Sequence, residues 1–321
     1  MDFKEFYAGE NDSGRRLDKI LRRFLNEMSL SELYKCIRKG LIKVNDKKIN
    51  QNYKVNQQDK ISIAAFLIEK NNSSSQDSKE KTETAADLLS LMPEIVFQNK
   101  DLIILNKPYG QLVQGSSVSL DKVIEQYYKK NSQDDSLGFR TGPLHRLDKN
   151  TTGLLAFSWS IKGAHWFSEN IQNHIVQKHY RGIVQGKITE KETWLDTITK
   201  EYNKENKFQT VNIEHNDTEN NSHTEVTPVA YGKYNGLDIT YVDFLIKTGR
   251  THQIRAQSSL HKHPLLGDTA YGGTRTELKN EYFLHAYELH FPSENPLELP
   301  EVITAELPDD FKYFLSKTCD I

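Results

Sequence analysis

Residues 145–153 read His-Arg-Leu-Asp-Lys-Asn-Thr-Thr-Gly and lead directly into the apolar run Leu-Leu-Ala-Phe at 154–157. The stretch places a basic residue, an apolar residue and a carboxylate at successive positions, and it closes with two hydroxyls and a glycine. The apolar run predicts a strand, so the polar residues form the loop before it. The carboxylate of this loop, Asp148, is either a structural ion-pair partner or a nucleophile held by its neighbours.

The composition of the chain limits its class. With 321 residues, 36% hydrophobic and 27% charged, it has room for more than one domain and resembles soluble globular proteins. The longest apolar runs, such as 61–68, are too short to span a membrane, and the first residues do not form a signal peptide. Cys36 and Cys319 lack the spacing of a disulfide framework or a metal site. We therefore expect a cytoplasmic protein without membrane contact.

The net charge of −2 conceals an asymmetry. Between Arg15 and Lys48 there are eleven basic residues and only four acidic ones, whereas the carboxyl end is acidic. A nucleic acid interacts with a local patch of charge on the protein surface, so the charge of this region matters more than the net charge of the whole chain. The amino-terminal region is therefore a candidate RNA-binding surface.

This region has the pattern of a small α+β domain. Apolar residues recur at helical spacing between Leu17 and Met28, and Ser29 with Glu32 forms a capping box that starts a second helix. Gly40 suits the end of that helix. Short strands are predicted at 41–44 and 60–63.

The pattern resembles the alpha-L RNA-binding domain first known from a ribosomal protein of the small subunit. The matching residues are Arg16-Leu17-Asp18, Ile37-Arg38-Lys39-Gly40, Val44-Asn45-Asp46 and Asp59-Lys60-Ile61. An ordinary basic helix pair is the alternative interpretation. The resemblance implies phosphate contacts without base readout. The residues expected to make them are Arg15, Arg16, Arg22, Arg23, Arg38 and Lys39.

We assign this domain to residues 14–68, a flexible polar linker to 69–90 and a larger domain to 91–321. In the larger domain short apolar runs predict strands at 95–97, 102–105, 154–157, 180–184 and 239–246. Helices are predicted at 121–129, 163–170 and 252–260. Many strands with few helices predict an α+β fold with a mainly antiparallel mixed sheet. The polar stretch 200–224 predicts a long hairpin or an insertion, and the glycine-rich 267–273 predicts a tight turn.

Four segments carry a second resemblance. They are Asn-Lys-Pro-Tyr-Gly at 106–110, the stretch 145–153, Lys-His-Tyr-Arg-Gly-Ile-Val-Gln-Gly at 178–186, and Thr-Gly-Arg-Thr-His-Gln-Ile-Arg at 248–255. In this order they resemble the RluA-type family of RNA pseudouridine synthases. An alpha-L domain ahead of them is typical of RluC- and RluD-like members, which modify ribosomal RNA. The resemblance implies an isomerase that converts uridines to pseudouridine in the large-subunit ribosomal RNA.

The family resemblance also implies catalytic roles. Asp148 matches the nucleophile, and whether it attacks the ribose or the base stays open. Arg255 is expected to pair with Asp148 and hold it in a pocket. Tyr180 matches a tyrosine whose ring stacks on the target uracil and whose hydroxyl helps remove the proton from carbon 5.

Further residues are implied in RNA contact. Arg146 matches the arginine that enters the space left by the flipped nucleotide. Lys107, Arg250 and His145 are weaker candidates for backbone contacts or loop support. The chemistry requires no metal and no organic cofactor, and we expect a monomer.

The sequence departs from the family pattern at a few positions. Gln114 stands where a histidine is frequent, Thr152 replaces a commoner serine, and Gln257 replaces a frequent histidine. These changes put substrate contacts in doubt more than catalysis. Two alternatives stay open: a catalytically silent RNA-binding factor of ribosome assembly, and the same enzyme acting on transfer RNA.

Overall fold

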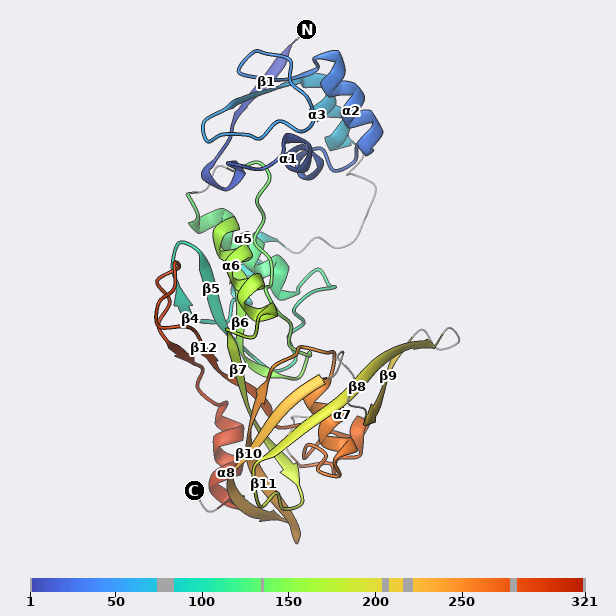
Figure 1. Cartoon of the computed structure of the whole chain (residues 1–321), viewed down its shortest axis with the longest axis vertical. Coiled ribbons are helices and arrows are strands. Elements are labelled where there is room, and N and C mark those ends of the chain that lie inside the picture. Colours follow the sequence, from blue (N-terminus) through green and yellow to red (C-terminus); the bar gives the residue numbers. More distant parts are fainter. Residues whose placement is uncertain are drawn as a thin grey trace. The chain divides into compact units, whose positions relative to one another are not determined.

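The computed structural model describes residues 2–73, 84–133, 136–203, 208–215, 222–277 and 282–319. The chain forms two compact units (Figure 1). The N-terminal unit contains Met1–Leu91, Lys122–Gly142 and Ser160–Lys162, and the sheet unit contains Met92–Asp121, Pro143–Trp159 and Gly163–Ile321. No helix in the described part of the chain is long and apolar enough to cross a membrane.

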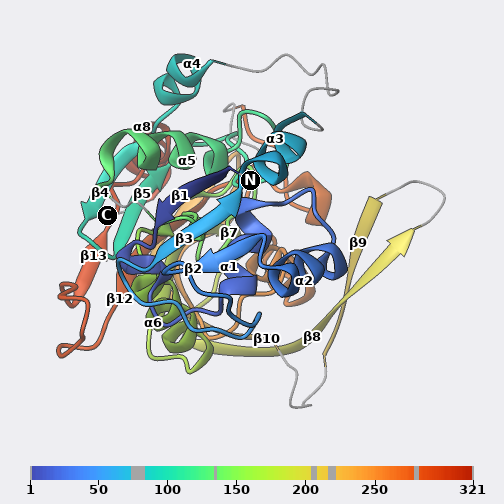
Figure 2. The same ribbon diagram turned by 90° about the horizontal axis from the view of Figure 1, so that it is seen from above.

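The N-terminal unit is built on a three-stranded antiparallel sheet in the order β1-β3-β2, whose strands lie side by side in Figure 2. Its elements are β1 (Phe3–Tyr7), η1 (Glu10–Asp12), α1 (Leu17–Phe24), α2 (Leu30–Lys39), β2 (Ile42–Val44), β3 (Lys60–Ala64), α3 (Ala65–Ser73) and α4 (Ala85–Ser90). Most of α5 (Leu120–Asn131) also belongs to this unit. The sheet begins with β1, before the predicted domain start at residue 14.

Local sequence explains the helices of this unit. Leu17, Ile20 and Leu21 are completely buried, which confirms the predicted apolar face of α1. The Ser29 hydroxyl accepts a hydrogen bond from the Glu32 backbone N–H at the start of α2, and the Glu32 carboxylate caps in return. Both predicted helices are thus confirmed.

The predicted linker 69–90 is not uniform. The helix α3 runs on to Ser73, and α4 opens with a capping box formed by Thr84 and Asp87. Residues 74–83, the middle of this segment, lie outside the described residues. The described ends of the segment are therefore helical, and the capping box is the local signal that starts α4.

Ten strands within the described residues form the sheet of the other unit, in the order β4-β5-β6-β12-β7-β11-β10-β8-β9, with β13 paired to β12. The strands are β4 (Glu94–Gln98), β5 (Leu102–Lys107), β6 (Thr152–Ser158), β7 (Gln177–Gln185), β8 (Glu192–Asn203), β9 (Phe208–His215), β10 (Ser222–Tyr234), β11 (Leu237–Ile246), β12 (Leu284–His290) and β13 (Val302–Thr304). The helices are α6 (Ile161–Gln172), α7 (Gln253–Leu260), η3 (Thr269–Tyr271) and α8 (Asp309–Thr318). The β6–β12 pair is parallel and the others are antiparallel, so the predicted α+β fold is confirmed.

The predicted polar hairpin corresponds to β8 and β9, which pair from Asp196 opposite His215 to Asn203 opposite Phe208. The hairpin extends away from the rest of the sheet (Figure 1). Residues 204–207 and 216–221 of the predicted 200–224 stretch lie outside the described residues.

The strand β6, which follows the loop 145–151, lies inside the sheet with all seven residues buried. It pairs with β5 on one side and with β12 on the other. Gly153 has φ +103°, and a Cβ atom here would collide with the backbone of Ala286. Only glycine lets β6 approach β12 in this conformation, and the start of β6 fixes where the preceding loop lies.

Candidate active site

A buried lysine holds the loop that carries Asp148. Lys107, at the end of β5, has no exposed surface, and its Nζ donates hydrogen bonds to the carbonyls of Pro108, Lys149 and Thr151 at 3.1, 2.8 and 2.8 Å. Burial lowers the pKa of Lys107 to about 7, while the charge of Asp148 acts in the opposite direction. The three carbonyl acceptors also favour the protonated amine. Of the two roles predicted for Lys107, these contacts favour loop support over an RNA contact, because its ammonium group is enclosed and its three donors serve the loop.

The sheet unit contains a cavity of about 430 Å³ in which most of the predicted site residues meet. Asp148, Tyr180 and Arg255 all line it, and so do Arg146 and Arg250, which are exposed to solvent. Among the described residues, no three His, Cys, Asp or Glu side chains gather so that they could hold a metal ion. The cavity is thus lined by one carboxylate, one phenol and several cations.

Arg255, on α7, connects Asp148 to a second carboxylate. Its Nη1 donates to Oδ2 of Asp148 at 3.4 Å, whereas its Nε and Nη2 donate to Asp268 at 2.6 and 2.9 Å. Asp268 is 2% exposed, so the two-bond pair is shielded from water. Burial acts to lower the pKa of Arg255, but the hydrogen bonds to Asp268 outweigh it and the pKa lies above its ordinary value. The cation opposite Asp148 is therefore permanent and fixed in direction.

Aromatic rings enclose the same guanidinium group. Arg255 lies over the rings of Tyr282 and Tyr271, 4.5 and 4.9 Å from their centres. The Tyr271 hydroxyl is 2.9 Å from Nδ1 of His252, and Nε2 of His252 is 3.7 Å from Oδ1 of Asp148. Each oxygen of the Asp148 carboxylate thus faces a nitrogen of a different side chain.

Tyr180 lies on β7 with only 6% of its surface exposed. Burial raises the pKa of the Tyr180 hydroxyl, and the negative charge of Asp148 raises it further. The hydroxyl is therefore protonated at neutral pH. Lys178 precedes Tyr180 by two residues, so it shares the same face of the strand, and it also lines the cavity.

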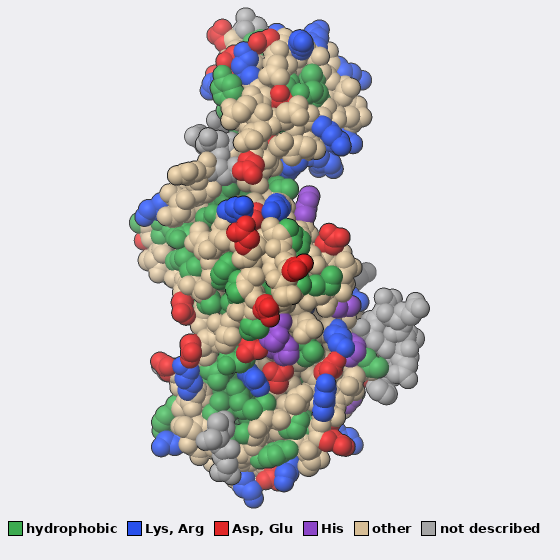
Figure 3. Space-filling view, turned by 60° about the vertical axis from the view of Figure 1, so that its left-hand side comes forward, with side chains coloured by type: hydrophobic (Ala, Val, Ile, Leu, Met, Phe, Trp, Pro, Cys, Tyr) green, Lys and Arg blue, Asp and Glu red, His purple; other side chains and the backbone are tan. Residues whose placement is uncertain are grey.

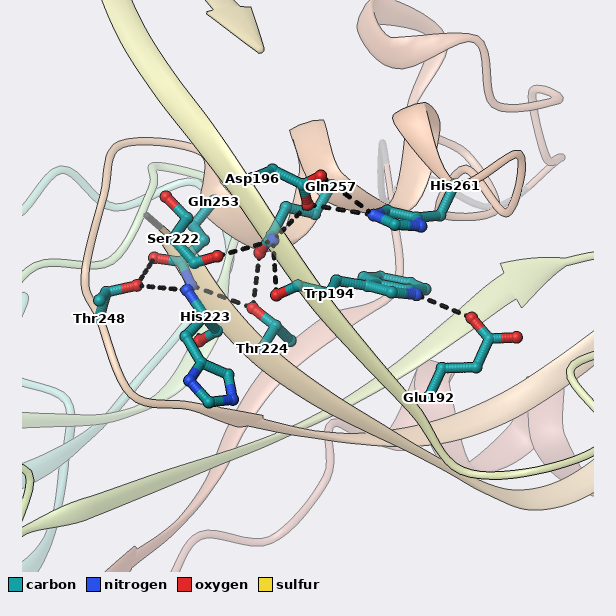
Figure 4. Close-up of polar contacts among 10 residues, drawn as sticks. All are labelled: Glu192, Trp194, Asp196, Ser222, His223, Thr224, Thr248, Gln253, Gln257 and His261. Carbon is teal, nitrogen blue, oxygen red and sulfur yellow. Dashed lines mark hydrogen bonds and ion pairs between the residues drawn. The ribbon is translucent and has the colours of Figure 1, made fainter. Parts of the chain in front are cut away.

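A buried polar network anchors α7 to the strands β8 and β10 (Figure 4). Gln257 donates to Oδ2 of Asp196 at 2.7 Å and accepts from the Thr224 hydroxyl at 2.6 Å. His261 caps the C-terminal end of α7, and its Nε2 lies 3.0 Å from Oδ2 of Asp196. Its ring stacks on the ring of Trp194. Gln257 is fully buried and does not line the cavity, so its departure from the family pattern affects packing and not a substrate contact.

Gln253, one turn earlier on α7, fixes the loop before the helix. Its Oε1 accepts a hydrogen bond from the Thr248 hydroxyl at 2.8 Å (Figure 4). The same oxygen also accepts from the Arg250 backbone N–H at 3.0 Å. Its Nε2 donates to the Thr224 hydroxyl at 3.0 Å. The network therefore sets the position of both Arg255 and the loop that forms one wall of the cavity.

A second cavity of about 240 Å³ also reaches Asp148. It shares Arg146, His252 and Arg255 with the larger cavity, and Gln114 is among its lining residues. Of the departures from the family pattern, Gln114 is thus the one that lies beside the site.

The six basic residues predicted in the N-terminal unit have different surroundings. Arg16 donates two hydrogen bonds to Asp18 at 3.1 and 2.7 Å. Arg23 donates to the carbonyl of Gly138 at 3.2 Å, and Arg15 is half-buried with Nη1 3.8 Å from Asp12. The side chains of Arg22, Arg38 and Lys39 are exposed, and Figure 3 shows Lys and Arg side chains gathered along one edge of this unit.

Comparison with known proteins agrees with this fold. Residues 101–260 match the family described as RNA pseudouridylate synthase, and residues 15–61 match the S4 domain. The chain is 33% identical to tRNA pseudouridine synthase C of Vibrio cholerae over 241 residues, which cover 70% of this chain and 96% of that protein. It is 28% identical to ribosomal large subunit pseudouridine synthase C of Vibrio vulnificus over 306 residues, which cover 90% of each. The structure of human RNA pseudouridylate synthase domain containing 4 shares the fold, with a TM-score of 0.56, 23% identity and coverage of 73% of this chain and 95% of that chain.

The fold and these matches define an enzyme that isomerises uridine in RNA. The chain belongs to the RNA pseudouridylate synthase family. Within it, the chain is a pseudouridine synthase of the RluA type with an N-terminal S4 domain.

Proposed function

We propose that this enzyme converts specific uridines of the large-subunit ribosomal RNA to pseudouridine, with Asp148 as the nucleophile. The observation that carries the proposal is the position of Asp148 in the 430 Å³ cavity, 3.4 Å from Arg255 and on the same cavity as Tyr180. Asp268 holds Arg255 from behind, so the carboxylate of Asp148 meets a cation in a fixed orientation.

The reaction conserves atoms and electrons within one nucleotide. The bond between uracil nitrogen 1 and ribose carbon 1 breaks, and its electron pair stays on the uracil. Carbon 5 of the rotated uracil then bonds to ribose carbon 1, carbon 5 loses its proton and nitrogen 1 gains one. A carboxylate suits the covalent step because it attacks readily and leaves again. Asp148 fills this role in our proposal.

Access to the target base requires that the nucleotide leaves its stack, which costs a few kcal/mol. Arg146 is exposed next to Asp148 and is suited to occupy the space that the nucleotide leaves. The buried ring of Tyr180 offers a stacking surface for the flipped uracil inside the cavity. Because the Tyr180 hydroxyl is protonated, we assign it to hydrogen bonding and proton relay and not to a phenolate base.

Two observations favour ribosomal RNA as the substrate. The N-terminal S4 domain adds exposed cations on α1 and α2, which suit a structured RNA backbone. The relative named as a large-subunit ribosomal enzyme matches 90% of this chain, whereas the match to the relative named as a tRNA enzyme covers 70%. The somewhat higher identity to the tRNA enzyme, 33% against 28%, keeps transfer RNA as the second candidate.

Mapping pseudouridines in total RNA tests activity and substrate together. Cells that lack the gene are compared with the same cells carrying a plasmid copy of it. We expect at least one pseudouridine of the large-subunit ribosomal RNA to disappear on deletion and return with the plasmid. Loss confined to transfer RNA would overturn the ribosomal assignment and keep the enzyme, and an unchanged map would overturn the proposed function.

A further inference from the structure

A lysine in the wall of the cavity has no hydrogen-bond or ion-pair partner among the residues that the structure describes. Lys178 lies on β7 with 7% of its surface exposed. Within the described part of the chain, no oxygen accepts a hydrogen bond from its Nζ and no carboxylate pairs with it. Its Nζ lies near the loop at Gly249, where an added Cβ atom would be 3.5 Å away. Buried ammonium groups in proteins are normally paired, so this one is suited to a partner that arrives with the substrate.

His145, a titratable neighbour of Lys178, cannot serve as that partner. His145 accepts a hydrogen bond at Nε2 from the backbone N–H of Ala156 at 3.1 Å. Burial and the charge of Lys178 lower the pKa of His145 to about 3, so the ring is neutral and its proton resides on Nδ1. Both ring nitrogens are therefore unable to accept from Lys178. Burial lowers the pKa of Lys178 to about 8, and the amine is still mostly charged at pH 7.

The position of Lys178 identifies the chemistry of its partner. Lys178 shares a strand face with Tyr180, so it lies beside the ring on which the flipped base stacks. The exposed cations Arg146 and Arg250 lie where phosphates are accessible, whereas Lys178 is enclosed. A uracil that enters the cavity and stacks on Tyr180 brings its carbonyl oxygens O2 and O4 close to Lys178, while the phosphates stay in water.

We propose that Lys178 is a further catalytic residue, whose ammonium group donates a hydrogen bond to a carbonyl oxygen of the uracil and stabilises the charge that develops there. This inference rests on the proposed function. When the glycosidic bond breaks, the electron pair left on the uracil is shared between nitrogen 1 and the carbonyl oxygens. A buried cation aimed at such an oxygen stabilises the detached base without giving up its proton. It also holds the base in the cavity while it rotates.

The first test replaces Lys178 with Met, which keeps the length of the side chain and removes the charge. Turnover is measured under single-turnover conditions as tritium release from RNA labelled at uracil carbon 5, and RNA affinity by filter binding. We expect about a 100-fold lower rate with RNA affinity unchanged. Thermal stability should not fall, because Met avoids burying an unpaired charge. Lys233→Met, at an exposed lysine of β10, is the matched control and should behave as the wild type.

If Lys178 instead contacted a phosphate, Lys178→Met would show the opposite pattern. RNA binding would be weaker, the slope of log affinity against log salt would be smaller by about one, and the rate would be unchanged. That result, or a normal rate in Lys178→Met, would overturn the assignment. If the wild-type enzyme released no tritium, the proposed function itself would fail, so the two failures are distinguishable.

The second test removes the acceptor from the RNA. Sulfur accepts hydrogen bonds weakly, so the target uridine is replaced by 2-thiouridine or by 4-thiouridine. We expect one of the two to slow the wild-type enzyme more than tenfold and to leave the already slow Lys178→Met variant nearly unaffected. Equal slowing of both enzymes, or no slowing of the wild type by either substitution, would contradict a contact between Lys178 and the uracil.

Discussion

Asp268 accepts two hydrogen bonds from Arg255, at 2.6 and 2.9 Å, and is almost completely buried. These bonds are shorter than the 3.4 Å bond from Arg255 to Asp148. The orientation of the cation beside Asp148 is therefore set by a second carboxylate, Asp268, on its other side. Of the contacts of Arg255, the hydrogen bond to Asp148 on the cavity side is the longer and weaker one, which leaves Asp148 able to move toward a reacting atom.

Replacing Asp268 with Asn should disturb catalysis without removing a group that touches RNA. A shift of the guanidinium by about 1 Å is enough to lower turnover by about 100-fold. RNA affinity should stay near the wild-type value. Turnover and filter binding measure the two effects. Asp243→Asn, at a carboxylate paired with Arg181 and His179, controls for the general loss of an ion pair. Equal losses in the two variants would speak against a specific role for Asp268.

Replacing Lys107 with Met should destabilise the protein. The substitution removes the Lys107 donor from the carbonyls of Pro108, Lys149 and Thr151, of which only the Lys149 carbonyl keeps another donor, the Gly110 backbone N–H. At about 1 kcal/mol for each of the two orphaned acceptors, the free energy of unfolding should fall by about 2 kcal/mol. Urea denaturation followed by circular dichroism measures it. Unchanged stability together with weaker RNA binding would show that Lys107 contacts RNA after all.

Acid should destabilise the fold through His285. This ring is fully buried between the Thr152 hydroxyl at Nδ1, 2.8 Å away, and the Ala305 carbonyl at Nε2, 3.2 Å away. Burial lowers the pKa of His285 to about 4, against about 6.5 in the unfolded chain. Between these values the unfolded state binds more protons, so the free energy of unfolding falls as the pH drops from about 6.5 to about 4. The slope reaches about 1.4 kcal/mol per pH unit for one such group.

The control for this effect is His285→Asn, which does not titrate. Its free energy of unfolding should be lower at neutral pH, but it should change less between pH 6.5 and 4 than that of the wild type. Denaturant titrations at several pH values measure the difference in slope. Parallel curves for the two proteins would refute the assignment to His285.

Much of the fold and part of the site were predictable from local sequence. The helices of the N-terminal unit follow from Ser29, Gly40 and an apolar face, and the loop of Asp148 follows from the polar residues before a buried strand. Asp268 was missed as a partner of Arg255, because the glycine-rich 267–273 indicates a turn but not what the turn faces. The burial of Lys107 was also missed, because two of its three acceptors, Lys149 and Thr151, lie more than 40 residues away along the chain. Local patterns report which element forms, whereas pairing across the sheet depends on the strand order.

The exposed cations of α2 should supply affinity for RNA without affecting the chemistry. Replacing Arg38 and Lys39 together with Ala should weaken RNA binding and lower the slope of log affinity against log salt by about 2. The rate at saturating RNA should stay the same. Filter binding at several salt concentrations measures the slope. A double variant at Lys233 and Lys317, exposed lysines of the sheet unit, serves as the control; an equal loss there would deny the N-terminal unit a specific part in binding.

The proposed mechanism depends most on Asp148 as the nucleophile. Its direct test is pseudouridine formation by Asp148→Asn, which keeps the shape of the side chain and removes the charge, with Asp148→Ala as a second variant. We predict no product above background from either protein under single-turnover conditions, with RNA affinity and thermal stability close to those of the wild type. Pseudouridine formed at the wild-type rate by either variant would contradict the central claim.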